Sequence, residues 1–338
     1  TVFTITSGST INGGSDVEFS TLLANEELGN ISITNQNLTV DNGSISVDDA
    51  NLLSATTTGV VTASIATTES VNELKTLTET SNAYTIVISS ADATAAAEDL
   101  STLDAKTTVT IDASEVTSLT GTYAEITALY ESAGVGNLGN EAVSISDALS
   151  VSQANIIDGL TTGVVTASIA TTESVNELKT LTETSNAYTI VVSTEDAAVS
   201  ASDLNVINGL TTVAVDLTNV TSITSSSLVD LGTLSTAIGN DEFTNDSGFT
   251  TIDVSDETID ATTLASTIDA YDSINGNSTT DMTLASGATI NVAASEVTHM
   301  LLDETQNRLD ITDQNIVVTE SISVDDANLL SATTTGVV

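Results

Sequence analysis

The feature that most constrains the fold is the repetition of whole stretches of sequence. TTGVVTASIATTESVNELKTLTETSNAYTIV occupies residues 57–87 and returns letter for letter at residues 161–191. ISVDDANLLSATTTGVV at residues 45–61 returns in the same way at residues 322–338. A catalytic site is normally needed once, whereas stacked repeats each bury an apolar face against a neighbour. The repetition therefore predicts an architecture before it predicts any chemistry.

Looser matches extend the second repetition. TVFTITSGSTIN from residue 1 resembles TDMTLASGATIN from residue 280, and TNQNLTV from residue 34 resembles TDQNIVV from residue 312. We interpret residues 1–278 as one long repeat made of about ten strand–helix units, and residues 279–338 as the start of its next copy. Because the sequence opens inside a predicted strand, we expect it to be part of a longer protein.

A shorter unit of about 24 residues lies inside the long repeat. In its strands, apolar residues alternate with Thr, Ser and Asp, so that Tyr84, Ile86 and Ile88 share one face. Apolar pairs three residues apart follow each strand, as at Leu74 and Leu77, and indicate a short helix. The strands are predicted to begin near Val60, Tyr84, Thr108, Val143, Val164, Tyr188 and Val213.

Local signals mark where these helices begin and end. Three helix starts carry the spacing of a capping box, in which a Ser or Thr precedes a Glu by three residues. A turn rich in Thr or Gly closes the helical stretch, as in LTTG at residues 160–163. The predicted capping boxes pair Ser70 with Glu73, Thr122 with Glu125, and Ser174 with Glu177.

These patterns favour an α/β solenoid, in which each stacked unit of about 24 residues is a short parallel strand plus a short helix. This is the plan of leucine-rich repeats without their asparagine-ladder consensus. An all-β solenoid or tandem β-sandwich modules are the alternatives, because Thr and Val lower helix propensity. The complete absence of Pro suits long parallel sheets. We expect residues 134–141, 239–249 and 272–281 to be projecting loops.

The composition of the chain argues against several classes of binding partner. Its 338 residues are 40% hydrophobic but only 3% aromatic, which predicts a large aliphatic core. Four basic residues face 47 acidic ones, a formal net charge of -43 that repels nucleic acid and anionic lipid. No apolar run approaches the ~20 residues of a membrane span. The chain has no Cys, and it therefore forms neither disulfides nor a thiol nucleophile.

The inventory of reactive side chains argues against an enzyme. His299 is the only His, and we interpret it as a packing or surface residue. One His and no Cys cannot build a zinc site of the usual kind, and no phosphate-binding glycine motif occurs. Carboxylate pairs that cut acidic sugars normally work beside basic and aromatic residues, which are scarce here. We therefore expect no catalytic residues and no organic cofactor.

Calcium is the chemical hypothesis that the sequence leaves open. The segment GNDEFTNDSGF brings together carboxylate and amide oxygens, which a hard cation prefers, at Asp241, Glu242, Asn245 and Asp246. An Asx-rich turn is the alternative, since EF-hand spacing is absent. Asp48 and Asp49 do not qualify as ligands, because the corresponding residues of the other copy are Ser152 and Gln153. We predict that these two aspartates cap a helix start.

Two stretches, ASDLNVINGLTTVAVDLTNVTSIT and AEDLSTLDAKTTVTIDASEVTSLTGTYAEITALY, carry a resemblance. A small residue, Asp-Leu, Thr-Thr and a Val-rich strand follow one another in both. This phrasing resembles repeat regions of the giant acidic secreted and cell-surface proteins of marine cyanobacteria, of hemolysin or surface-layer type. The resemblance implies a surface-layer, sheath, fibre or adhesive role. The chain lacks the Gly-Gly-x-Gly-x-Asp repeat of the calcium-binding members, which argues against a calcium-dependent mechanism.

The sequence thus leads us to expect a structural module of a giant repetitive extracellular or cell-surface protein. Its repeats would stack end to end into a fibre, sheath or stalk, with self-association into a filament or matrix as its main interaction. A cell-surface adhesin or calcium-binding module, with divalent cations as partners, is the second hypothesis. A polysaccharide-cleaving solenoid enzyme is the third.

Overall fold

The structure is a computed structural model that describes residues 2–275 and 281–338. The chain divides into two compact regions, the first comprising Thr1–Asp147 with Ile156–Ala167 and the second Ala148–Asn155 with Ser168–Val338. Both regions are mixed α/β, and every strand pair in them is parallel. The predicted boundary between residues 278 and 279 lies outside the described residues.

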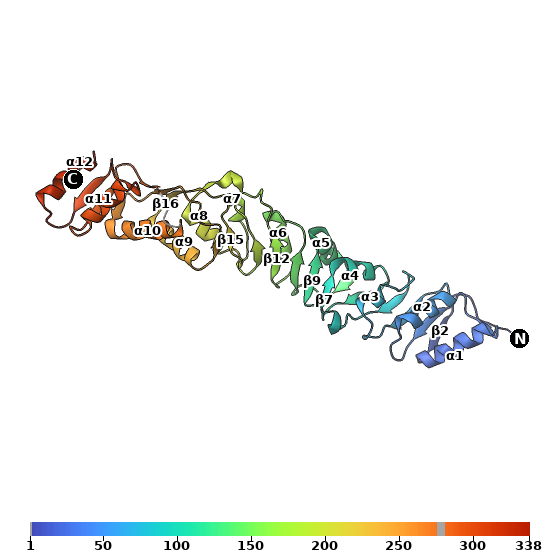
Figure 1. Cartoon of the computed structure of the whole chain (residues 1–338). Coiled ribbons are helices and arrows are strands. Elements are labelled where there is room, and N and C mark those ends of the chain that lie inside the picture. Colours follow the sequence, from blue (N-terminus) through green and yellow to red (C-terminus); the bar gives the residue numbers. More distant parts are fainter. Residues whose placement is uncertain (1, 276–280) are drawn as a thin grey trace. The chain divides into compact units, whose positions relative to one another are not determined.

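In the first region, strands separated by helices lie side by side in sheets (Figure 1). One sheet has the order β2-β4-β5-β6, a second joins β7, β9, β11 and β12, and two-stranded sheets pair β1 with β3 and β8 with β10. The strands are β1 (Phe3–Thr4), β2 (Thr10–Gly13), β3 (Ile31–Ser32), β4 (Asn37–Val40), β5 (Val61–Ser64), β6 (Ala83–Thr85), β7 (Thr94–Ala96), β8 (Ile111–Asp112), β9 (Ser118–Gly121), β10 (Val135–Gly136), β11 (Ala142–Ile145) and β12 (Val165–Ser168). The helices are α1 (Asp16–Glu27), α2 (Val47–Thr56), α3 (Val71–Leu74), α4 (Ala97–Asp104) and α5 (Tyr123–Glu131), with a 3-10 turn η1 (Ser90–Asp92).

The second region follows the same plan. Its sheets have the orders β14-β16-β18-β20-β22, β19-β21-β23 and β15-β17. The strands are β13 (Ala187–Thr189), β14 (Ala198–Val199), β15 (Val215–Asp216), β16 (Ser222–Ser226), β17 (Phe243–Thr244), β18 (Thr251–Val254), β19 (Thr258–Asp260), β20 (Asp281–Leu284), β21 (Thr289–Val292), β22 (Leu309–Asp310) and β23 (Asn315–Val318). The helices are α7 (Val175–Leu178), α8 (Ala201–Asn208), α9 (Leu228–Gly239), α10 (Ala261–Ile274), α11 (Val297–Thr305) and α12 (Val324–Thr333), with a 3-10 turn η2 (Thr194–Asp196), and the remaining helix, α6 (Val151–Asp158), has residues in both regions.

Helices pack against the next helix along the chain, just as each strand pairs with a strand of the neighbouring repeat. In the first region α3 contacts α4 and α4 contacts α5. In the second, each helix from α7 to α11 contacts its successor. Each strand–helix repeat is therefore held chiefly by the repeats before and after it, which is the contact pattern of an α/β repeat fold.

The core is aliphatic, as the composition predicts. The predicted face of Tyr84, Ile86 and Ile88 is buried, with at most 1% exposure at each residue. Apolar pairs three residues apart are buried on the inner faces of the helices, among them Leu100 with Leu103 and Leu204 with Ile207. Burial of such side chains contributes about 1.5–3 kcal/mol each and drives the packing of every repeat.

The predicted helix starts are confirmed. The capping boxes of α3, α5 and α7 form in full, with reciprocal bonds between side chain and backbone. Asp48 and Asp49 lie in the first turn of α2, whose N-cap Ser46 accepts a hydrogen bond from the Asp49 backbone N–H. These two aspartates therefore act on the helix start, where negative charge is favourable.

The predicted loops were partly wrong. Residues 134–141 contain β10, which pairs with β8, and residues 239–249 contain β17, which pairs with β15. Phe243 explains the second case, because its side chain is 3% exposed and anchors β17 in the core. Residues 272–281 include the end of α10 and the first residue of β20, and the residues between 275 and 281 lie outside the described part.

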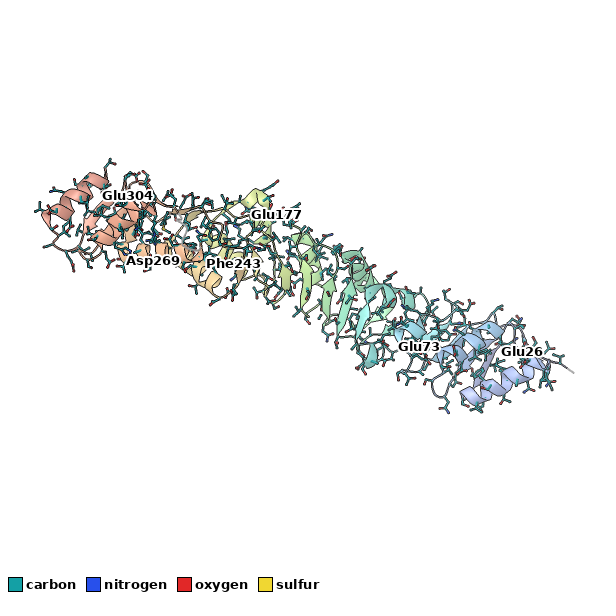
Figure 2. All side chains as sticks on the ribbon, viewed as in Figure 1. Glu26, Glu73, Glu177, Phe243, Asp269 and Glu304 are labelled. Atoms are coloured by element: carbon teal, nitrogen blue, oxygen red, sulfur yellow. The ribbon has the colours of Figure 1, made fainter. Side chains whose placement is uncertain are left out.

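Acidic side chains populate the surface. Glu73 and Glu177, for example, are exposed at the starts of α3 and α7 (Figure 2). Among the helices of the described residues, none combines the length and the apolar character that crossing a membrane requires.

Candidate functional site

The four residues predicted to bind an ion differ in their hydrogen-bond partners. Glu242 is exposed and accepts hydrogen bonds from Asn208 Nδ2 at 2.5 Å and Asn240 Nδ2 at 3.4 Å. Asn245 instead donates from Nδ2 to Asp216 Oδ1 at 2.9 Å, which ties it to the preceding repeat. Across residues 2–275 and 281–338, no three His, Asp or Glu side chains are grouped so as to hold a metal ion.

The backbone around this loop is bent, and one carboxyl is partly buried. Asp241 and Asn245 have φ of 60° and 55°, in the left-handed region that Asp and Asn tolerate better than most residues. Burial raises the pKa of Asp246 above its usual value, and the negative charge of Asp241 adds to this effect. The calcium site at Asp241, Glu242, Asn245 and Asp246 stays a prediction from the sequence.

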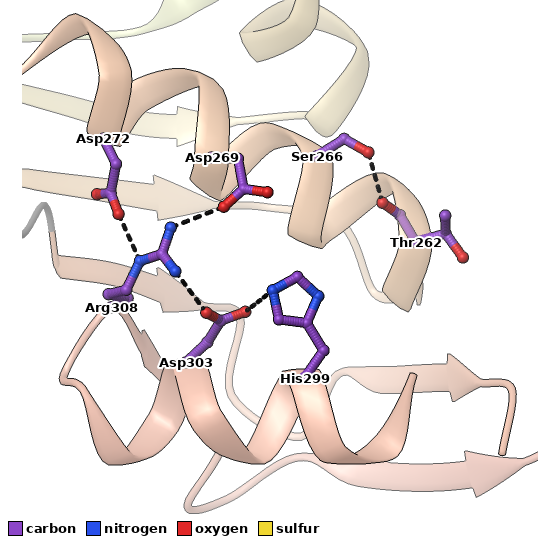
Figure 3. Close-up of polar contacts among 7 residues, drawn as sticks. All are labelled: Thr262, Ser266, Asp269, Asp272, His299, Asp303 and Arg308. Atoms are coloured by element: carbon purple, nitrogen blue, oxygen red, sulfur yellow. Dashed lines mark hydrogen bonds and ion pairs between the residues drawn. The ribbon is translucent and has the colours of Figure 1, made fainter. Parts of the chain in front are cut away.

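A charged cluster surrounds the single arginine (Figure 3). Arg308 Nη2 lies 2.8 Å from Asp269 Oδ1 and its Nη1 lies 2.9 Å from Asp303 Oδ1, while Nε forms an ion pair with Asp272. His299 Nε2 approaches Asp303 Oδ2 at 4.0 Å. The arginine thus ties α10, which carries Asp269 and Asp272, to the end of α11, which carries Asp303.

Burial governs the electrostatics of this cluster. The side chain of Asp303 is 2% exposed, and burial raises its pKa even though the charge of Arg308 acts in the opposite direction. Burial alone would lower the pKa of Arg308, but its hydrogen bond to Asp269 and the charges of Asp272 and Asp303 outweigh it and raise that pKa. The cluster therefore keeps its cation fixed between two helices, with His299 as a partly exposed neighbour of Asp303.

The contacts that recur along the chain are made by threonine. In each of five Thr-Thr turns, the first threonine donates a hydrogen bond from Oγ1 to a carbonyl of the preceding repeat, at 2.6 or 2.7 Å, and accepts one from the N–H two residues later. We call these residues the threonine clamps. They are Thr57, Thr107, Thr161, Thr211 and Thr334.

Each clamp meets a buried residue of the preceding repeat. The accepting carbonyls belong to residues that are no more than 1% exposed, namely Gln36, Tyr84, Glu141, Tyr188 and Gln314. The second threonine of every turn donates from its backbone N–H to the carbonyl of the residue two positions before the one that accepts from the clamp. Thr108, for example, donates to the Asn82 carbonyl at 2.9 Å. Two neighbouring threonines thus satisfy two carbonyls of the repeat before them, which a parallel sheet edge would otherwise leave unpaired.

Asparagines make a second kind of bridge. Asn51 Nδ2 donates to the Thr76 carbonyl at 3.1 Å, and its Oδ1 accepts from the Thr78 N–H at 2.9 Å. Asn155 repeats both bonds with Thr180 and Thr182. One side-chain amide therefore joins a helix to a carbonyl and an N–H group of the next repeat.

Carboxylates of a following repeat cap helix starts. Asp92 accepts from the N–H of Val71 at 3.0 Å, and Asp196 accepts from that of Val175 at 2.8 Å. The first residues of α5, α6 and α9 are capped in the same way by Asp147, Glu173 and Asp256. A carboxylate at this position satisfies an orphan N–H and meets the positive end of the helix dipole. Part of the acidic excess is therefore structural.

All four basic side chains also bind a neighbouring repeat. Lys75 Nζ lies 2.5 Å from Asp99 Oδ1, and Lys179 Nζ lies 2.6 Å from Asp203 Oδ1. Lys106 donates to the Leu77 carbonyl at 2.6 Å, and Arg308 ties α11 to α10. All four cationic side chains thus stabilise contacts between repeats.

Sequence reasoning missed most of these joints. The persistence of Asn51 as Asn155 between otherwise differing copies, and the return of Thr-Thr after α2, α4, α6, α8 and α12, were the signals that could have revealed them. No family model matches the chain, and comparison with curated proteins and solved structures found no match either. The internal copies of the chain form the same contacts between neighbouring repeats.

Proposed function

We propose that this chain is a structural module of a giant repetitive extracellular protein that forms a fibre, sheath or surface stalk. Its strand–helix repeats would form an α/β solenoid and stack end to end, and its role would be mechanical rather than catalytic. The observation that carries the proposal is the recurrence of the same threonine clamp at five joints spread along the chain. Repeated joints of this kind allow a structure to be lengthened by adding repeats, whereas a binding or catalytic site is normally needed only once.

Identical sequences in different surroundings support stacking further. Val47 and Val324 occupy the same position of the doubled segment, yet Val47 is 3% exposed and Val324 is 76% exposed. Ile45 of the first copy pairs with Ile65, and Asn51 reaches Thr76 and Thr78. No described repeat follows the second copy. The apolar face of a repeat is thus buried by its neighbour and not by the repeat itself, which is the energetic basis of stacking.

The composition fits a resistant material outside the cell. Few Lys or Arg residues are present for trypsin-like proteases, and all four are engaged in joints. The net charge of -43 would keep parallel rods apart through repulsion over a Debye length of about 8–10 Å at physiological salt. A core without Cys would need no oxidising step to assemble.

Electron microscopy of the native assembly tests this proposal. We expect continuous rods of uniform width, with repeats running along the rod axis. Separate compact globules connected by thin linkers would contradict the proposal, because such globules would bury their apolar faces without end-to-end stacking.

A further inference from the structure

A groove lies between α8 and α9 of the second region. It consists of a hollow of about 450 Å³ lined mainly by these two helices and an adjoining hollow of about 300 Å³ lined by residues 211–214 and Asp241. Asn208 and Glu242 line both hollows and are joined by their hydrogen bond. Ligand sites commonly have volumes of about 300–1,000 Å³, so the groove is large enough for a small organic group.

The groove appears where the repeat departs from its earlier copy. In the first region, Asp104 occupies the position that corresponds to Asn208, and it accepts a hydrogen bond from Ser132 at 2.7 Å. Gly134 lies so close there that a Cβ would come within 1.5 Å of Asp104 Oδ1. At the later joint α9 is longer than α5, and Glu242 replaces this tight contact. The two corresponding joints thus differ at this point.

The chemistry of the lining favours a ligand that donates hydrogen bonds. The hydroxyls of Thr233 and Thr236 already donate to carbonyls within α9, and Asn205 Nδ2 donates to the Asp230 carbonyl. Two carboxylates, Asp241 and Glu242, line the groove, and no basic side chain does. A positively charged donor would therefore meet carboxylate, amide and hydroxyl oxygens there.

The walls offer apolar surface beside these oxygens. Val229 is 77% exposed and Val213 is 37% exposed, and both line the groove. A Cβ built on Gly232, in the middle of α9, would meet no atom within 4 Å. An alkyl chain could lie along this surface while its charged end reaches the carboxylates, as lysine side chains do on proteins.

We propose that this groove binds an alkylammonium group, the chemistry shared by a lysine side chain and a free aliphatic diamine. The net charge of -43 would raise the local concentration of such cations. A bare divalent ion fits less well, because the groove is far larger than an ion. The proposal is independent of end-to-end stacking.

Titration of the whole chain, followed by NMR of its backbone amides at about 0.15 M salt, tests this proposal. The probes are cadaverine, Nα-acetyl-lysine methylamide, the neutral diol of cadaverine length, and Ca²⁺ alone. We expect saturable shifts around Asn208, Asn240 and Glu242 with at least one ammonium probe and none with the diol. Saturation by cadaverine alone would identify a free diamine as the source, and saturation by the lysine derivative would identify a peptide.

Three variants separate the groove from general attraction of cations. Glu242→Gln should weaken binding at least about tenfold, because it removes a charged hydrogen-bond acceptor. Gly232→Leu should fill the groove and abolish saturation while the fold remains, whereas Glu195→Gln, at an exposed acid outside the groove, should change nothing. Equal weakening by Glu195→Gln, shifts without saturation, or binding of Ca²⁺ in place of both ammonium probes would overturn the proposal.

Discussion

At the scale of single residues, a buried threonine side chain links neighbouring repeats through hydrogen bonds. The Oγ1 of Thr107 donates to the Tyr84 carbonyl at 2.7 Å and accepts from the N–H groups of Tyr84 and Val109. Thr107 is 7% exposed, so water cannot easily replace these bonds. Only a short side chain that both donates and accepts can fill this position, which explains why Thr recurs there while surrounding residues vary.

Thr107→Val should therefore be markedly destabilising. Valine has nearly the same shape but would leave two N–H groups and one carbonyl without the partner they have now, which we expect to lower the free energy of unfolding by about 2–4 kcal/mol. Urea denaturation of the purified chain measures this change.

Thr108→Val is the matched control. Thr108 is exposed, and its backbone N–H already bonds the same Asn82 carbonyl as its hydroxyl does, so we expect a loss of only about 0.5 kcal/mol. Equal effects of the two substitutions would show that the clamp contributes nothing beyond β propensity.

A buried acid provides the opposite test. Glu141 is 0% exposed and accepts from Tyr130 Oη at 2.7 Å and from the Gly139 N–H. Gln36 and Gln314 hold the equivalent position at other joints. We expect Glu141→Gln to raise the free energy of unfolding by about 1 kcal/mol at neutral pH, because an amide keeps the contacts without a buried charge. A loss of stability in the same urea experiment would show that the charge itself is needed.

At the scale of elements, the helices were predicted better than the strands. Helix starts carry their own signals, and the boxes of Ser70 with Glu73 and Ser174 with Glu177 form as the spacing predicts. Strands such as β9 and β16, with sequences SLTG and SITSS, have too few apolar residues for a period of two to emerge. Their strand conformation comes from pairing with adjacent repeats, which no local pattern records.

The capping boxes make a prediction about pH. The pKa of Glu73 lies below its usual value, first because the Ser70 backbone N–H donates to its carboxylate and second because the Ser70 hydroxyl does so. A lowered pKa in the folded state means that the box stabilises the helix above the usual pKa of glutamate and loses this effect as pH falls through the lowered value. NMR titration of the side-chain carboxyls should find both Glu73 and Glu177 below 4.5, with the same shift in the two copies. A value at or above 4.5 for either residue would mean that its box is open in solution.

At the scale of the whole molecule, composition dictated more than motifs did. The aliphatic core and the acidic surface followed from residue counts, and the α/β class with parallel strands followed from the recurring strand and helix patterns of the repeat. The candidate sites did not follow, because the Arg308 cluster and the α8–α9 groove each depend on residues from two repeats whose pairing no single stretch of sequence encodes. Asn245 shows the same limit, since its partner Asp216 lies in another repeat.

The acidic excess should make stability depend on salt. Screening shortens the range of the repulsion among the 47 carboxylates from about 30 Å at 0.01 M salt to about 8 Å at 0.15 M. We expect the melting temperature to rise by several degrees over this range, and differential scanning calorimetry can follow it. A melting temperature that falls with salt would show that the ion pairs between repeats outweigh the repulsion.

The central claim is that repeats are held mainly by their neighbours and can therefore be added in series. Inserting a second copy of residues 57–160 before residue 161 leaves both junction sequences native, because TTGVV follows the insertion in either copy. Small-angle X-ray scattering should then find a maximum dimension longer by about 19 Å, from about four strand spacings of 4.8 Å, with an unchanged cross-sectional radius. Growth in all directions, or an inserted block that stays unfolded, would contradict the account.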